Sequence, residues 1–443
     1  MRSAPERSEA APATRPRMVA VLLLSALGFG LTLYVFYPGV MNYDARYVYS
    51  YIGQNPPGDW QSPLMTLLWA LIDPIAPGPG SMFLLIVSLY WLAFALLALT
   101  VARRSWVALA LPLLALSPPT FVLVGMIWRD VLFAAVWLLA AVLVFAATDR
   151  HPTLRYWIQA VAFALLAFGV LLRPNAVPAV PVLAAYILCP ARWQLRRAAL
   201  IYVPALVAFF ILVPLVYYGI IGAKREHPLH QIIVFDLGGI THFTKQNQFP
   251  LSWAPDETAL ITERCYQPSE WNFYWNHGPC QFVMRRLVEE KIFGTPALAD
   301  VWWRAVMKHP IAYLQHRAAF MQTFLFGMNT VMWTMDIENS DRIVFADRPA
   351  FMRLKAMHDA LEATWVFKPG TWLPLCAALA VLGWRRRDTP EGAFVLGVCG
   401  SGAVYVATYF FVGVASDFRY SYWTVLAGIA GCVVLLPRTI ARG

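Results

Sequence analysis

The chain has 443 residues, of which 59% are hydrophobic and only 14% are charged, and its mean hydropathy is +0.55. Soluble domains carry about 25% charged residues, so this composition excludes an ordinary soluble domain and predicts an all-α polytopic membrane protein. The net charge of +10 comes from basic residues dispersed between apolar segments, a distribution that argues against a nucleic-acid partner.

The first apolar segment covers residues 18–37 and follows a basic leader, 1–17. It reaches the roughly 20 residues that a helix needs to cross a bilayer core. A secretory signal peptide is the rival interpretation. The apolar part is long for such a signal, however, and no small-residue cleavage site precedes Pro38-Gly39. We therefore predict an uncleaved first transmembrane helix.

Basic clusters between the later apolar segments predict the topology, because lysine and arginine concentrate in cytoplasmic loops. They lie at 103–104, 150–155, 191–197, 385–387 and 438–442. If all of them are cytoplasmic, the chain has about ten transmembrane helices and both termini are cytoplasmic. The expected spans are 18–37, 81–102, 105–121, 131–148, 154–172, 175–190, 198–221, 371–384, 392–414 and 421–437.

Two further apolar segments are not counted as spans. Residues 64–77 are too short to cross and are interrupted by Asp73-Pro74, which favours a re-entrant or interfacial helix. Residues 311–335 contain His316 and Arg317, and a crossing there would break the parity that the basic loops require. For this segment we expect an amphipathic helix on the outer surface.

This topology divides the chain into a leader (1–17), an N-terminal membrane module (18–221) with its first outer loop at 38–63, an extracytoplasmic region (222–370) and C-terminal membrane helices (371–443). Cys265 and Cys280 lie fifteen residues apart in the extracytoplasmic region. A disulfide there would stabilise by about 3 kcal/mol in the chain-entropy model. Two free thiols are the alternative.

The first outer loop, "MNYDARYVYSYIGQNPPGDWQSP" (41–63), is unusually rich in polar side chains. Asn42 is a good N-cap for a short helix that Gly53 ends, and Asp44 falls in its first turn, where the helix dipole favours a carboxylate. Stabilisation of this helix end is the alternative role for Asp44. The same loop contains Arg46, Asp59 and Gln61, and Tyr43, Tyr47 and Tyr51 form a stripe that can rest at the membrane interface.

Four other turns on the predicted outer face carry polar clusters. They are Arg129 and Asp130 in "IWRDVLFA", Arg173 and Asn175 in "LLRPN", Asp236 and His242 in "VFDLGGITHF", and Asp417, Arg419 and Tyr420 in "ASDFRYSYW". Charges at a membrane usually mark function or pairing, so we expect a composite site built from all five loops. Each cluster has an alternative interpretation. Arg129 with Asp130 and Asp417 with Arg419 could be structural ion pairs, and Arg173 could snorkel to lipid headgroups. His242 could be a surface histidine, and "RPN" could be only a helix stop.

The motifs "YPGVMNYD" and "GDWQSP", followed in order by "IWRDVLFA", "LLRPN", "FDLGGI" and "DFRY", resemble the GT-C superfamily of membrane glycosyltransferases. The resemblance is greatest to bacterial members related to protein mannosyltransferases and to enzymes that modify lipid A or O-antigen. It implies a polyprenyl-phosphate-linked sugar donor and an extracytoplasmic active site in the bacterial inner membrane. It also implies that Asp44 is the catalytic aspartate and Asp59 the second acidic residue. Relatives often have a histidine where this chain has Ser62.

In an inverting transfer, Asp44 would remove the proton from the acceptor hydroxyl. Arg173 and Arg419, followed by Arg129, are the expected ligands of the departing phosphate, because guanidinium binds phosphate in a bidentate manner. Trp60, Trp271 and Trp275 are suited to stacking on sugars or to interfacial anchoring. The expected supporting residues are Arg46, Gln61, Asp130, Asn175, Asp236, Asp417 and Tyr420.

The sequence leaves three matters open. It does not decide whether a divalent metal (Mg or Mn) assists, because no metal-ligand spacing is evident. The acceptor is a glycan, a lipid or a protein. Two other functions compete with glycosyl transfer: a flippase for lipid-linked sugars, which should place its charges at mid-membrane in repeated halves, and an O-antigen ligase or polymerase.

Overall fold

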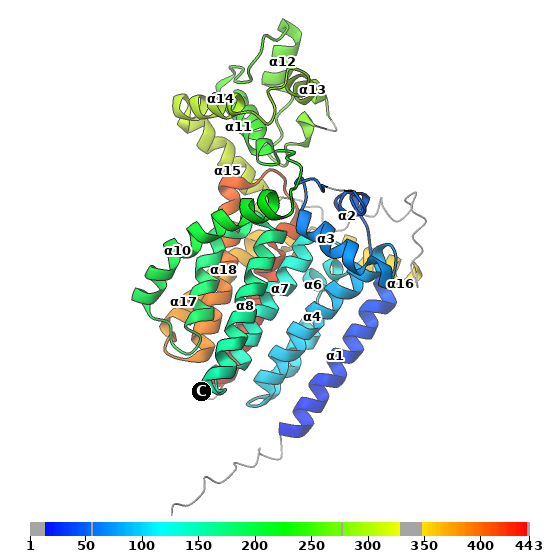
Figure 1. Ribbon diagram of the computed structural model, residues 1–443, viewed down its shortest axis with the longest axis vertical. Coiled ribbons are helices and arrows are strands. Elements are labelled where there is room, and N and C mark those ends of the chain that lie inside the picture. The colour runs from blue at the N-terminus through cyan, green and yellow to red at the C-terminus, as the bar shows by residue number, and fades with distance from the viewer. Residues whose placement is uncertain (1–13, 55, 276–277, 328–347, 441–443) are drawn as a thin grey trace, which may run out of the picture.

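The computed structural model describes residues 14–54, 56–275, 278–327 and 348–440. Within these residues the regular structure is helical, with three isolated β-bridges and no named strand. The helices form an elongated bundle and a smaller lobe that stands on one end of it (Figure 1). The lobe comprises residues 230–326. The all-α fold that the composition predicts is confirmed for the described residues.

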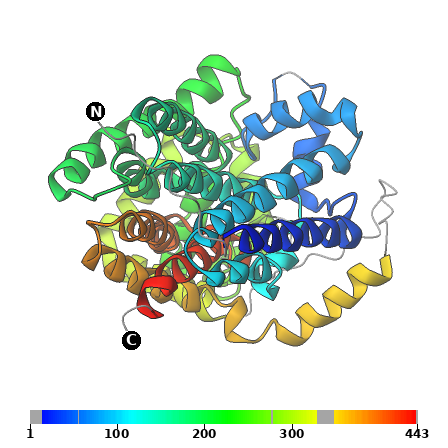
Figure 2. The same ribbon diagram turned by 90° about the horizontal axis from the view of Figure 1, so that it is seen from below.

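In the described residues, seven helices are long and apolar enough to cross a membrane, which makes the chain a multi-pass membrane protein. They are α1 (Thr14–Phe36), α4 (Pro79–Ala102), α7 (Arg129–Ala146), α8 (Pro152–Leu172), α10 with the π-helical η4 (Leu195–Pro214 and Leu215–Ile220), α18 (Pro390–Val412) and η8 with α19 (Phe418–Ser421 and Tyr422–Ile440). The pair Trp106–Leu114 and Pro118–Val124 is apolar enough as well but is bent by 52°, which is the geometry of a broken span or of a re-entrant loop. In cross-section α7 lies inside the bundle and α10 at its periphery (Figure 2).

The expected count of ten spans is not reached in the described residues, because two of the segments form shorter helices. Residues 175–190 fold as the 3-10 helix η3 (Pro174–Ala179) and α9 (Val180–Leu188). Pro174, Pro178 and Pro181 lie within this stretch, and proline removes a backbone donor and disrupts a continuous α-helix. The helix over 371–384 is α17 (Pro369–Arg385), with 17 residues.

The basic loops meet at the end of the bundle opposite the lobe. Arg104 pairs with Asp149 at 3.7 Å and with Glu391, and Arg192 pairs with Asp388 at 2.7 Å. These contacts bring together loops that are far apart in the sequence, and α19 also ends at this side (Figure 1). The loops on which the predicted topology depends therefore share one end of the molecule.

The lobe contains α11 (His230–Thr244), α12 (Pro255–Glu263), α13 (Gln281–Glu289), α14 (Pro296–Lys308) and α15 (Pro310–Phe326). A disulfide between Cys265 and Cys280 links the end of α12 to the start of α13. In α11, a side chain at Gly238 would collide with the Tyr274 hydroxyl, and one at Gly239 with the His316 ring. The two glycines of "FDLGGI" thus allow close helix packing.

Asp236 is the centre of the lobe's packing. Its carboxylate pairs with Arg317 Nη2 at 2.6 Å, contacts His316 Nε2 at 3.1 Å and accepts a hydrogen bond from Trp302 Nε1 at 2.8 Å. Arg317 Nη1 also donates to the Gly413 carbonyl, 2.7 Å away, just beyond the end of α18. One guanidinium therefore fixes the lobe to the bundle.

This arrangement corrects the prediction for 311–335. The described part of that segment is α15, which packs against α11 in the lobe and against α17 and α18 in the bundle instead of lying on a surface. His316 and Arg317 are fully buried, and both lie against the Asp236 carboxylate. Residues 328–335 lie outside the described residues.

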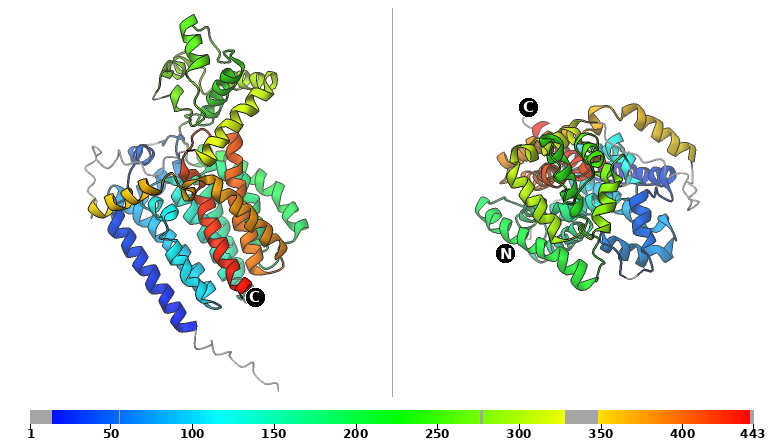
Figure 3. Two further views of the ribbon diagram at one scale, coloured as in Figure 1. Left: turned by 180° about the vertical axis from the view of Figure 1, so that it is seen from behind. Right: turned by 90° about the horizontal axis from the view of Figure 1, so that it is seen from above.

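Two helices lie across the lobe end of the bundle. The first is α3 (Pro63–Ile72) with η1 (Asp73–Ile75), where Leu67, Leu71 and Ile75 are exposed at four-residue spacing and form an apolar stripe. Such a stripe suits the interfacial helix predicted for 64–77. The second is α16 (Arg348–Leu361), which runs beside the end of α1 (Figure 3) and packs Phe351 on Phe36 with ring centroids 5.9 Å apart.

The buried pair in the lobe leads to a stability prediction. Asp236→Asn leaves the Arg317 charge buried without its counter-charge, and we expect a loss of about 3–5 kcal/mol in the free energy of unfolding. Chemical denaturation of the detergent-solubilised protein, followed by tryptophan fluorescence, measures this loss. The exposed Asp300 on α14 gives the matched control, because Asp300→Asn should change stability by less than about 0.5 kcal/mol. Equal denaturation midpoints for the two variants would contradict the prediction.

Candidate functional site

The first loop folds as its sequence predicts around Asn42. Asn42 Oδ1 accepts a hydrogen bond from the Ala45 backbone N–H at 3.1 Å and caps α2 (Tyr43–Ser50). Asp44 lies in the first turn of this helix, where free N–H groups favour an anion. The cap fixes the direction of α2, and with it the position of the Asp44 carboxylate at the lobe end of the bundle.

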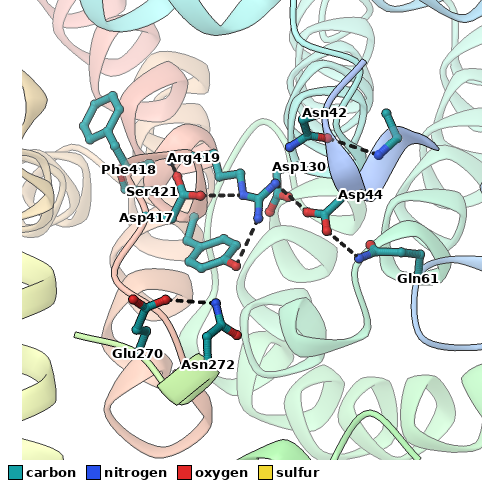
Figure 4. Close-up of polar contacts among 12 residues, drawn as sticks. Asn42, Asp44, Gln61, Asp130, Glu270, Asn272, Asp417, Phe418, Arg419 and Ser421 are labelled. Atoms are coloured by element: carbon teal, nitrogen blue, oxygen red, sulfur yellow. Dashed lines mark hydrogen bonds and ion pairs between the residues drawn. The ribbon is translucent and has the colours of Figure 1, made fainter. Parts of the chain in front are cut away.

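Asp44 is held through both carboxylate oxygens (Figure 4). Arg419 Nη1 donates to Oδ2 at 2.6 Å, and Gln61 Nε2 donates to Oδ1 at 3.1 Å. The Asp44 side chain remains 28% exposed, so an incoming molecule can reach it. Burial alone would raise the pKa of Asp44, but Arg419, with Arg129 and Arg173, holds this pKa below its ordinary value. Asp44 is therefore an accessible, ionised carboxylate at neutral pH.

Arg419 joins Asp44 to a second carboxylate. Its Nε pairs with Asp417 Oδ2 at 2.9 Å, while its guanidinium lies 4.5 Å from the Trp128 ring centroid. Asp417 also caps η8 by accepting a hydrogen bond from the Arg419 backbone N–H at 3.1 Å. Burial raises the pKa of Asp417 to about 6, although Arg419 opposes this shift. The two aspartates on one arginine thus have pKa values shifted in opposite directions.

Arg173 forms the second ion pair of the site. Its Nε lies 2.8 Å from Asp130 Oδ1, and its Nη2 donates to the Tyr409 hydroxyl at 3.0 Å. Asn175 Nδ2 donates to the same hydroxyl at 2.9 Å. The Arg173 guanidinium also lies 4.7 Å from the Tyr420 ring centroid, next to Arg419. Asp130 is therefore paired with the arginine of another loop, and Arg173 is held by protein groups.

Arg129 differs from the other two arginines of the site. It is the first residue of α7, is half-buried and interacts electrostatically with Asp44, Asp130 and Arg173. Within the described residues it nevertheless makes no ion pair and no hydrogen bond through its guanidinium. Arg129 is therefore the arginine whose donors remain available to an anionic ligand.

Asp59 has a different environment from Asp44. Its Oδ2 accepts a hydrogen bond from the Tyr218 hydroxyl at 2.6 Å, and its Oδ1 accepts one from the Glu226 backbone N–H at 2.6 Å. Glu226 in turn accepts hydrogen bonds from Tyr47 and Tyr51. Asp59 thus fixes the segment after η4 against the first loop, and two of the three tyrosines of the predicted interfacial stripe bind Glu226 instead.

Two other predicted residues also lie outside the Asp44 cluster. Asp236 and His242 belong to the lobe helix α11, so only four of the five predicted loops meet. Arg46 is half-buried in α2. Ser62, which stands where relatives often have a histidine, caps α3 by accepting a hydrogen bond from Met65 N–H and donates to the Leu171 carbonyl at 2.8 Å. Its role here is to fix α3 to the end of α8.

The site also contains residues that the sequence did not single out. Tyr405 and Tyr409 lie one turn apart within the apolar helix α18. Two hydroxyl groups four residues apart inside an apolar span are the pattern in the sequence that could have indicated them. From the lobe, the Trp271 backbone N–H donates to Val414 O at 2.8 Å, and Glu270 forms a β-bridge with Ala415. These contacts bring residues 270–272 of the lobe close to the turn that contains Asp417 (Figure 4).

Within the described residues, one group of three side chains has the spacing of a metal site: His358, Asp359 and Glu362 on α16. Asp359 is also paired with Lys355 there. No comparable group is found around Asp44 in the described part of the chain. In comparisons with known proteins, no protein family, no curated protein and no solved structure matches this chain.

The raised pKa of Asp417 predicts a pH effect on stability. Between its ordinary value of 3.8 and its folded value of about 6, the folded protein holds a proton that the unfolded chain has lost. Asp417 therefore lowers the free energy of unfolding by about 3 kcal/mol as the pH rises through this window. Asp417→Asn should remove this loss. The free energy of unfolding of the variant should therefore rise relative to that of the wild type as the pH increases from 3.8 to about 6. Chemical denaturation at a series of pH values measures both proteins. A free energy of unfolding that changes equally with pH in the wild type and in Asp417→Asn would contradict the prediction.

Proposed function

We propose that this protein is an inverting glycosyltransferase that moves a sugar from a polyprenyl-phosphate donor to an acceptor hydroxyl of the cell envelope. One observation carries the proposal: the accessible carboxylate of Asp44 and the guanidinium of Arg129, which has no ion pair within the described residues, interact at one end of an apolar helix bundle. The first is suited to accept a proton and the second to bind a phosphate.

Asp44 acts as the general base. The acceptor oxygen attacks the anomeric carbon from the side opposite the phosphate, the C–O bond to phosphate breaks, and the bonding electrons leave with the phosphate. Each carboxylate oxygen of Asp44 retains a lone pair for the acceptor proton besides its bond to Arg419 or Gln61. Because the pKa of Asp44 is lowered, proton transfer occurs late, after the attacking oxygen has become acidic.

Arg129 is the first choice for the phosphate. Fixed cations stabilise the charge that grows on the leaving group, and they act best when no protein carboxylate already occupies their donors. Arg173 is paired with Asp130, and Arg419 with Asp44 and Asp417. Arg173 and Arg419 therefore position the carboxylates and add positive potential, and the exposed apolar side chains of the spans offer a surface for the prenyl chain.

The location of the site follows from two features. The basic loops lie at the end of the bundle away from Asp44, and basic loops favour the cytoplasm. The lobe beside Asp44 contains the Cys265–Cys280 disulfide, a bond that persists in oxidising compartments. Both features support an active site on the outer face of the bacterial inner membrane, with the termini in the cytoplasm.

Asp44→Asn tests the base. We expect sugar transfer to fall by about 10²- to 10⁴-fold, because asparagine cannot take the proton. The assay follows radiolabelled sugar from polyprenyl-phosphate mannose, glucose and galactose into the envelope fraction of membranes from a deletion strain that expresses each variant. Asp149→Asn, the same change at the opposite end, is the control and should transfer like the wild type.

Normal transfer by a folded Asp44→Asn protein would rule out this base. The deletion strain also separates transfer from transport. Loss of a transferase lets the donor accumulate on the outer leaflet, whereas loss of a flippase traps it on the cytoplasmic leaflet.

Arg129→Gln tests the phosphate ligand. Loss of a charged hydrogen-bond donor costs about 1.5–3 kcal/mol, so we expect kcat/KM for the donor to fall about 10- to 100-fold, with partial recovery in Arg129→Lys. Arg103→Gln, at the other end of the bundle, is the matched control. If Arg129→Gln leaves donor kinetics unchanged while Arg173→Gln lowers them, the assignment of the phosphate to Arg129 is wrong.

A further inference from the structure

Three tryptophans form a cluster where the first loop meets the lobe. Trp60 lies 6.0 Å from Trp271 and 5.7 Å from Trp275, and Trp271 lies 5.8 Å from Trp275, measured between ring centroids. Trp271 is 4% exposed, whereas Trp275 is 40% exposed. The two inner rings therefore support an outer ring that is open to solvent.

Trp275 forms one wall of a groove of about 520 Å³ that follows α13. Three polar residues of α13, spaced four apart, line this groove: Gln281, Arg285 and Glu289. Met284 and Val288 lie beside them and recur at the same spacing. Residues four apart share one side of a helix, so the groove has a polar row next to an apolar row and an aromatic ring.

Two residues of the polar row, Arg285 and Glu289, have donors and acceptors to spare. Within the described residues, Arg285 and Glu289 make no ion pair and no side-chain hydrogen bond, with each other or with a third residue. The arginine can donate two parallel hydrogen bonds and the carboxylate can accept several. Neighbouring hydroxyls of a sugar ring match such groups, and the ring's apolar C–H face matches an exposed tryptophan. A lipid tail would leave the two charges unmatched.

The tryptophan cluster connects this groove to Asp44. Trp60 directly precedes Gln61, whose amide donates to Asp44 at 3.1 Å. Trp271 is fixed to the other side of the site, because its backbone N–H donates to Val414, three residues before Asp417. The Trp275 wall of the groove is thus connected through Trp60 and Trp271 to the two segments that carry Asp44 and Asp417.

We propose that this groove binds carbohydrate, and that the acceptor of the transfer reaction is a glycan whose sugar units lie on Trp275 and along α13. The identification of the glycan as the acceptor rests on the proposed function, whereas the binding of carbohydrate does not. The groove holds the sugars that precede the reacting unit and directs the terminal hydroxyl toward Asp44.

Direct binding tests the proposal without catalysis. The full-length protein, in nanodiscs of phosphatidylethanolamine and phosphatidylglycerol, is applied to an array of oligosaccharides of hexoses, deoxyhexoses and amino sugars. We expect binding to at least one group of glycans, weakened about tenfold or more by Trp275→Ala and by Arg285→Ala. Trp275→Phe keeps a ring and should retain most of the affinity. Asp149→Asn, at the opposite end of the bundle, should bind like the wild type.

Three results would overturn the carbohydrate groove. The first is no binding to any glycan on the array, and the second is binding that both alanine variants retain. The third is equal signal from protein-free nanodiscs, which would assign the signal to lipid. Intact glycan binding together with Asp44-independent transfer would overturn only the proposed function. Loss of binding in Trp275→Ala with unchanged transfer would overturn only the role of the groove in acceptor binding.

Discussion

The candidate site depends on the interaction of one guanidinium with two carboxylates. Arg419 lies 375 residues after Asp44 in the sequence, yet the two side chains pair at 2.6 Å, and the same arginine holds Asp417 at 2.9 Å. A mostly buried charge is costly unless it is paired and hydrogen-bonded. The turn that precedes α19 must therefore lie against the first loop, and this requirement sets the position of Gln61 and the close approach of Arg173 and Tyr420.

Most ionisable residues of this cluster form ion pairs with one another, and one, Arg129, forms none among the described residues. Asp44, Asp130 and Asp417 face Arg173 and Arg419, and these five groups account for every ion pair in the cluster among the described residues. Arg129 adds a positive charge without a partner of its own. In the proposed reaction this charge is the one that a donor phosphate can use, because fixed cations stabilise the charge that grows on a leaving group.

The sequence predicted features that depend on neighbouring residues better than those that depend on distant ones. The apolar length of α1, α4, α7, α8 and α18 and the capping preference of Asn42 are local properties, and the structure shows each of them. The partner of Asp130 is Arg173, not its neighbour Arg129, because the choice is made by packing between loops. For the same reason Asp236 and Asp59, each beside polar residues in the sequence, form contacts in the lobe and with the segment after η4. No local pattern distinguishes such an aspartate from Asp44.

The opposite pKa shifts of the two aspartates on Arg419 give each a distinct role in the proposed reaction. Asp44 is partly exposed and faces three arginines, so it stays ionised, while Asp417, only 8% exposed, has a pKa near 6 because burial penalises its charge. Environments that separate the pKa values of two carboxyl groups usually separate the proton acceptor from the group that can hold a proton. A bound phosphate would bring further negative charge, which raises the pKa of nearby carboxyl groups. In the proposed reaction, such a rise acts on Asp417 from a pKa already near 6, whereas the three arginines oppose it at Asp44. A bound donor would therefore protonate Asp417 before Asp44 and leave Arg419 paired with the proposed base.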